Sequence, residues 1–137
     1  MGQMGDIRRG LAERIAGLPD FEGYPFMPDA INVPCAWVEP DSPFVNYQVV
    51  FAGGATEWRF LITILSNRQD EESGQEILDE YLSPDGLIVG ALQARGVGDL
   101  LDETAQYVNV ISASRYGSYK VGGTHYFGVQ LSVEVRA

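Results

Sequence analysis

Apolar residues recur along this chain first at helical spacing and later at strand spacing. Near the start, Ile7, Leu11 and Ile15 lie four residues apart, with Asp6 ahead of them. This spacing places one apolar face on a helix over residues 6–17, with Asp6 as its N-cap. The last run, residues 125–136, alternates strictly and predicts a half-buried antiparallel strand. Its inward positions are Phe127, Val129, Leu131, Val133 and Val135.

Between these ends, the first predicted strands follow a proline-rich loop over residues 20–32. Residues 35–39 lie between Pro34 and Pro40, which favours an edge strand or a strand end because proline cannot donate to a ladder. Residues 47–52 and 56–66 both alternate and are separated by a short glycine-rich link, which predicts a hairpin. Apolar residues fall on both faces of the second run, so we expect that strand to be central and covered on both sides.

Helical spacing returns in the second half of the chain. Ser73 and Glu76 have the spacing of a capping box and predict a helix over residues 73–82. A proline and a glycine then separate it from a further helix over residues 87–94. A second hairpin joins residues 107–116 to the last strand through a glycine turn. The predicted fold class is α+β: a mainly antiparallel sheet of about five strands, flanked by an N-terminal helix and a central helix pair.

Length and charge narrow the class of protein. A chain of 137 residues is a common size for one domain, so we expect residues 1–137 to form a single domain. The formal charge of −10 disfavours general affinity for nucleic acid. No stretch approaches the roughly 20 apolar residues of a membrane span, and the N-terminus lacks a secretory signal. We therefore expect a protein made in the cytoplasm, with no membrane partner and no specific nucleic-acid binding.

Residues that carry chemistry are sparse. Cys35 is the only cysteine and His125 the only histidine, so neither an internal disulfide nor a cysteine-based zinc site can form. In its apolar run, Cys35 is expected to pack as a small hydrophobe, and His125 to have a structural role near a turn. The glycine pairs do not follow the order of a phosphate-binding loop. We predict no catalytic, cofactor-binding or metal-ligating residues and no enzymatic activity.

Acidic residues are concentrated on the predicted second helix. Glu72, Glu76 and Glu80 stack along one side of the predicted second helix, and each such like-charged pair costs roughly 0.2 to 0.5 kcal/mol. One interpretation is a solvated face on an acidic protein. The other is a surface that meets basic groups of a partner or faces a passage for DNA. In the second case, the bases of the first helix are candidates to pair with the acidic helix of a neighbouring copy: Arg8, Arg9 and Arg14.

The last hairpin is the other candidate contact surface. Tyrosine and arginine are enriched at protein interfaces, and this hairpin concentrates them, although ordinary sheet aromatics explain the pattern as well. The candidates are Arg115, Tyr116, Tyr119, Lys120 and Tyr126.

The layout as a whole resembles a known family. The likeness rests on the opening helix, the proline-rich passage over residues 25–40, Leu65-Ser66-Asn67-Arg68 before an acidic helix, and the ending that begins Val121-Gly122-Gly123-Thr124-His125. In these features the chain resembles the tail terminator proteins of long-tailed (siphovirus-type) phages, particularly those of actinobacterial hosts.

The resemblance implies a virion protein without catalytic residues. Such a subunit forms a homo-oligomeric, hexameric ring on the head-proximal end of the tail. There it caps the tail tube protein, ends tube polymerisation, and offers a surface for head–tail connector proteins, while DNA passes through the ring. Two alternatives stay open: another head–tail connector or tail-completion protein, and a small ligand-binding α+β domain. The last would hold its ligand in an apolar pocket with Trp37 and Trp58.

Overall fold

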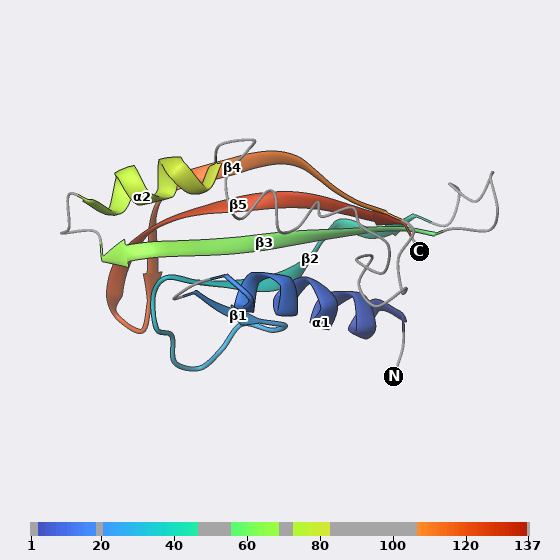
Figure 1. Cartoon of the computed structure of the whole chain (residues 1–137), viewed down its shortest axis with the longest axis horizontal. Coiled ribbons are helices and arrows are strands. Elements are labelled where there is room, and N and C mark those ends of the chain that lie inside the picture. The colour runs from blue at the N-terminus through green and yellow to red at the C-terminus, as the bar shows by residue number, and fades with distance from the viewer. Residues whose placement is uncertain (1–2, 19–20, 47–55, 69–72, 83–106, 137) are drawn as a thin grey trace.

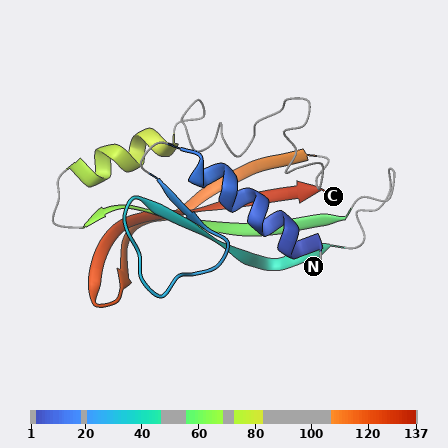
Figure 2. The same cartoon turned by 60° about the horizontal axis from the view of Figure 1, so that its bottom comes forward.

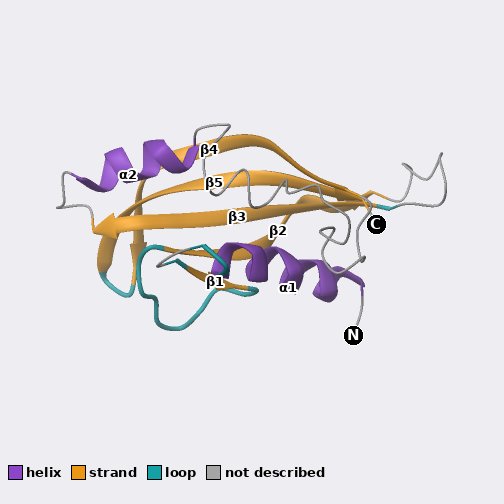
Figure 3. Cartoon of the chain, viewed as in Figure 1, coloured by secondary structure: helices purple, strands orange, loops and turns teal. Residues whose placement is uncertain are grey.

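The computed structural model describes residues 3–18, 21–46, 56–68, 73–82 and 107–136 (Figures 1 and 3). Its elements are α1 (Gln3–Ala16), β1 (Glu22–Tyr24), β2 (Cys35–Asn46), β3 (Glu57–Arg68), α2 (Ser73–Leu82), β4 (Tyr107–Val121) and β5 (Thr124–Arg136). The strands form one five-stranded sheet in the order β1-β2-β3-β5-β4. Only β1 and β2 pair in parallel; the other neighbours are antiparallel. The predicted α+β class with a mostly antiparallel sheet is thus confirmed.

Helix α1 forms because its apolar residues share one face. Ile7, Leu11 and Ile15 are completely buried, as the four-residue spacing predicts. The helix begins three residues earlier than expected, so Asp6 lies in its first turn, where a negative charge favours the helix dipole, instead of capping it. The helix ends where the Gly17 amide donates to the Glu13 carbonyl at 3.0 Å.

Both helices pack on one face of the sheet, which we name the helix face. The buried residues of α1 and Leu78 of α2 belong to one apolar cluster with alternate residues of the strands. Because side chains alternate along a strand, every second residue of β3 and β5 points into this core. These residues are Phe60, Ile62, Ile64, Val129, Leu131, Val133 and Val135. The inward pattern predicted for the last strand is confirmed, and β3 is central in the sheet.

Strand β2 departs from the prediction. We expected a short strand ending before Pro40, but β2 continues to Asn46 and pairs with β3 on both sides of an irregularity between Pro40 and Val45. Proline is tolerated because the pairing is interrupted at this point. The predicted strand over residues 47–52 lies outside the described residues, as does the predicted helix over residues 87–94. Among the described residues the N-terminal helix and one small central helix flank the sheet.

Strand β1 was not predicted and depends on one glycine. It lies at the sheet edge beneath α1 (Figure 2). A Cβ atom on Gly23 would stand 2.3 Å from the Ala12 carbonyl oxygen and 3.0 Å from the Ala16 amide nitrogen. Only a residue without a side chain lets strand and helix backbones approach so closely.

A smaller apolar cluster lies on the other face of the sheet, towards the beginning of β2. Cys35, Trp37 and Leu65 are buried there. Partly buried side chains from β1, from the loop before β2 and from the β4–β5 hairpin pack against them: Tyr24, Ile31, Val33, Tyr119, Val121 and Tyr126. This cluster accounts for the apolar Leu65 on the second face of β3. No helix within the described ranges is long and apolar enough to cross a membrane.

Candidate functional site

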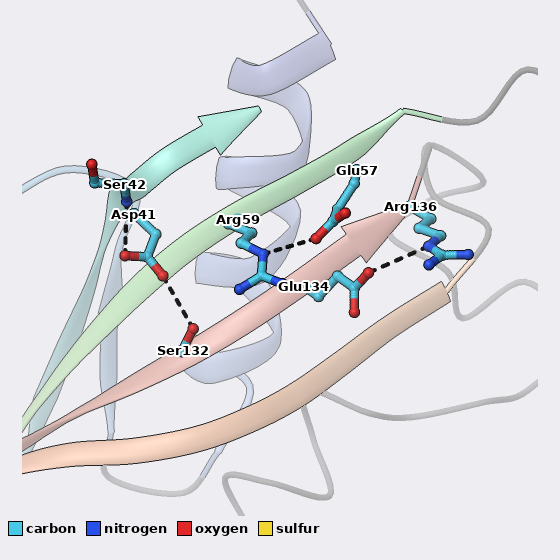
Figure 4. A network of polar contacts seen from close by, with 7 residues as sticks. All are labelled: Asp41, Ser42, Glu57, Arg59, Ser132, Glu134 and Arg136. Atoms are coloured by element: carbon cyan, nitrogen blue, oxygen red, sulfur yellow. Dashed lines mark hydrogen bonds and ion pairs between the residues drawn. The ribbon is translucent and has the colours of Figure 1, made fainter. Parts of the chain in front are cut away.

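Beyond the smaller cluster, the second face of the sheet carries an ordered set of charges (Figure 4). We name Glu57, Arg59, Glu134 and Arg136 the charge quartet. Glu57 lies opposite Arg136, and Arg59 opposite Glu134, on the neighbouring strands β3 and β5. Along each strand the arginine Nε atom also meets a glutamate Oε1 atom, at 2.8 Å in β3 and 3.3 Å in β5. Every charge therefore has an opposite charge across the sheet and along its own strand, an arrangement that favours this register.

The carboxylates of the quartet are sheltered and the arginines face outward. The side chains of Glu57 and Glu134 are 8% and 13% exposed, against 40% and 41% for Arg59 and Arg136. The hydrogen bond to Glu57, with the nearby charges of Glu134 and Asp41, raises the pKa of Arg59 above its usual value. Arg59 therefore stays positive.

Asp41 extends this polar surface to a third strand. Its Oδ2 atom accepts a hydrogen bond from the Ser132 hydroxyl at 3.1 Å, and its Oδ1 atom accepts one from the Ser42 amide at 2.8 Å (Figure 4). Asp41 lies in the irregular part of β2 and reaches across β3 to β5. It thus fixes the strand where proline interrupts the pairing. This surface was not predicted from the sequence. Its sequence feature is the pair of opposite charges two residues apart on each of two predicted strands, which places both charges of a pair on one face.

The predicted basic residues of α1 do not form one solvent-facing patch. The Arg8 guanidinium lies 4.5 Å from the centre of the Phe26 ring, a cation–π contact. Arg14 is partly buried in the last turn, and Arg9 is exposed. Of these three bases, Arg9 is therefore the one best placed to meet a partner.

Arg9 stands at the rim of a cleft between α1 and β1. The cleft has a volume of about 230 Å³ and is lined by Arg9, Ala12, Glu13, Ala16, Gly23 and Pro25. Sites for small molecules are typically larger, about 300 to 1,000 Å³. Three of the residues that line the cleft are small: Ala12, Ala16 and Gly23.

The acidic residues of α2 behave as predicted where they are described. Glu76 and Glu80 are exposed, and so is Asp79 between them. The Asp79 Oδ1 atom accepts a hydrogen bond of 2.9 Å from the Tyr116 hydroxyl of β4. Glu72 lies outside the described residues. Helix α2 packs over β3 and β5, and this hydrogen bond joins its acidic surface to the edge strand β4.

The aromatic hairpin separates into two groups. Tyr119 and Tyr126 pack on the smaller apolar cluster, and the Tyr119 hydroxyl donates to the Arg115 carbonyl at 2.6 Å. They are structural. The other members are exposed: Arg115, Tyr116 and Lys120.

Cys35 and His125 sit in very different surroundings. Burial, with a smaller contribution from the charge of Glu22, raises the pKa of the Cys35 thiol to about 12. Cys35 is completely buried, so it packs as a small apolar residue, as predicted. His125 is exposed beside the hairpin turn, with Nδ1 3.2 Å from the Ser118 hydroxyl.

The ligand-pocket alternative required two tryptophans around one cavity. Trp37 belongs to the smaller cluster, whereas Trp58 packs against the cluster on the helix face. The sheet therefore separates them, and neither lines the cleft beside α1. Among the described residues, no group of histidine, cysteine and acidic side chains has the arrangement of a metal site.

No known family model matches the sequence, and no curated protein matches it either.

Proposed function

We propose that this chain is a structural subunit of a phage tail, the terminator that forms a homo-oligomeric ring, expected to be hexameric, on the head-proximal end. The specific role comes from the resemblance of its element order and sequence runs to tail terminators. In this role the ring caps the tail tube protein, stops its polymerisation and offers a surface to head–tail connector proteins.

One observation supports a subunit that assembles into a ring through contacts between two different surfaces of identical copies. Opposite edges of the sheet carry different surfaces (Figure 1). At one edge, the exposed Tyr116 of β4 donates a hydrogen bond to Asp79 of α2, a helix that packs over β3 and β5. At the other edge, α1 and β1 form a cleft with Arg9 at its rim. Contacts between unlike surfaces generate rings when the rotation closes.

The charge of the chain agrees with a ring that DNA traverses. A net charge of −10 disfavours retention of a polyphosphate that must slide past. The acidic residues of α2 are candidates for this lining, because Glu76 and Glu80 are exposed and no basic residue lies in the last turn of the helix.

Labelling of intact virions tests the location. Antibodies raised against the purified chain and coupled to gold should bind tails at the head-proximal end, and only when the head has been detached or the neck opened. Labelling along the whole tube or at the distal tip would contradict the proposal. Virions of an unrelated phage supply the control for unspecific binding.

A further inference from the structure

We propose that the exposed face of the Tyr116 ring of one subunit packs against the cleft between α1 and β1 of a second copy of this chain. This contact rests on the proposed ring and names the surfaces that build it. Tyr116 lies on the edge strand β4, and the cleft lies at the opposite edge of the sheet. A copy that donates Tyr116 therefore keeps its own cleft accessible to the next copy, as a head-to-tail ring requires.

Tyr116 has the features of a preformed anchor. The pairing of β4 with β5 is irregular between Ser114 and Gly117, so Tyr116 sits in a bulge, next to Arg115 with a positive φ of 54°. The side chain is 45% exposed although it is large and aromatic. Its hydroxyl is nevertheless fixed by Asp79. A side chain that is ordered before binding loses less entropy when a partner covers it.

The cleft suits one aromatic side chain. Ala12, Ala16 and Gly23 contribute little or no side chain to its lining, so an aromatic ring can lie flat against this surface. Its volume of about 230 Å³ is small for a drug-sized ligand. Burial of a tyrosine ring against such small apolar residues is the usual form of an interface anchor.

The charges beside the two surfaces match. The cleft rim carries Arg9 and Glu13, one of each sign. Tyr116 has Arg115 before it in the chain and is bonded to Asp79, again one of each sign. A docked arrangement can place Arg9 against Asp79 and Glu13 against Arg115. Such complementarity selects one orientation of the partner and suppresses others.

Photo-crosslinking tests the contact directly. Tyr116 is replaced by the photoreactive aromatic residue p-benzoylphenylalanine in the full-length chain, which is mixed with isotope-labelled wild-type chain and irradiated over a concentration series. We expect crosslinks from position 116 to labelled peptides within residues 9–25. The matched control places the same residue at Ile111, which is 43% exposed on the same strand. Absence of labelled products from position 116, or the same products from position 111, would overturn the proposal.

Charge exchange provides a second measurement that leaves the fold intact. Glu13 and Arg115 are both exposed, and Tyr119 bonds to the backbone carbonyl of Arg115 and not to its side chain. Glu13→Arg and Arg115→Glu should each weaken self-association about tenfold, and the double variant should recover it. Additive losses in the double variant would contradict the pairing.

The outcomes separate this contact from the tail function. If crosslinks into the cleft form but deletion of the protein leaves tail length normal, the interface is supported and the proposed function is contradicted. If deletion gives abnormal tails but no such crosslinks form, the proposed function is supported and the interface is contradicted.

Discussion

At the scale of single residues, glycines decide how closely the elements pack. Gly23 lets α1 lie directly on β1, with backbone atoms where a side chain would stand. Gly128 has a similar place inside the sheet, since a Cβ there would meet the Leu65 and Tyr119 side chains at 2.6 Å. The smaller apolar cluster can form across β5 because this position is empty.

Substitution of Gly23 by alanine should therefore destabilise the protein. The new methyl group meets backbone atoms, which cannot rotate away, so we expect Gly23→Ala to lower the free energy of unfolding by about 1 to 3 kcal/mol. Gly17→Ala is the matched control, because its nearest neighbours would lie at 3.5 and 3.6 Å. Urea unfolding of both variants measures the difference. Equal stabilities would show that α1 does not rest on β1 as described.

Cys35 makes stability depend on pH in the alkaline range. Its folded pKa of about 12 exceeds the value of about 8.5 for a free thiol. Below pH about 8.5 both states hold the proton and the full stability is present. As pH rises towards 12, the unfolded chain loses the proton first, so stability falls by at most about 1.4 kcal/mol per pH unit.

Unfolding of the wild type and of Cys35→Ala between pH 8 and pH 10.5 measures this dependence. The variant loses packing and is less stable at every pH, but its stability should fall less steeply. Parallel curves would contradict the raised pKa.

Side-chain roles were only partly predictable from the sequence. The burial of Cys35 follows from its apolar run, and the exposure of Glu76 and Glu80 follows from helical spacing. The hairpin tyrosines look alike in sequence, yet Tyr119 is used inside the molecule and Tyr116 is exposed. A bulge in β4 separates them, and local sequence does not encode the register of distant strands.

At the scale of elements, regular periodicity was reliable and irregular geometry was not. Strand β5 and helix α1 follow their apolar spacing because each buries one face in the same core. The predicted end of β2 at Pro40 was wrong, since the strand continues past an irregularity. Strand β1 has three residues, which is too short to show an alternation of apolar and polar residues. Its pairing with β2 depends on the contact with α1.

The charge quartet stabilises the pairing of the start of β3 with the end of β5 only while its charges balance. Arg59→Met leaves the sheltered Glu57 carboxylate without its closest opposite charge, so we expect a loss of about 1 to 3 kcal/mol in unfolding free energy. Adding Glu57→Gln should recover most of the loss, because no uncompensated charge then remains.

Thermal or urea unfolding of the single and double variants tests this coupling. Lys120→Met is the control: Lys120 is exposed, and its loss should change stability by less than about 0.5 kcal/mol. A double variant as unstable as the sum of its single changes would show that the quartet is not coupled.

At the scale of the whole molecule, the distribution of charge should matter for assembly more than for folding. Glu80→Lys reverses a charge on the exposed acidic face of α2, so we expect normal unfolding but fewer completed tails. Asp29→Lys makes the same change in charge on an exposed loop and should leave tail assembly unchanged. The yield of infectious particles measures both, and equal yields would argue against a functional acidic surface.

The fold class was predictable because the helix α1 and the strand β5 each have one apolar and one polar face, and the spacing of their apolar residues shows which kind of element each one is. The proposed contact between copies was not predictable, since it combines residues of α1 and β1 with a residue in the irregular part of β4. The sequence suggested basic α1 against acidic α2. In the structure, Arg9 is the exposed one of the three bases of α1, and a cleft lies beside it.

The length of tails made without this protein tests the central claim most directly. The gene is deleted from the phage genome, tails are imaged by electron microscopy, and the chain is then supplied from a plasmid. The proposal predicts tubes of uncontrolled length without attached heads, and restored length and joining when the chain is supplied. Tails of normal length joined to heads in the deletion strain would contradict it.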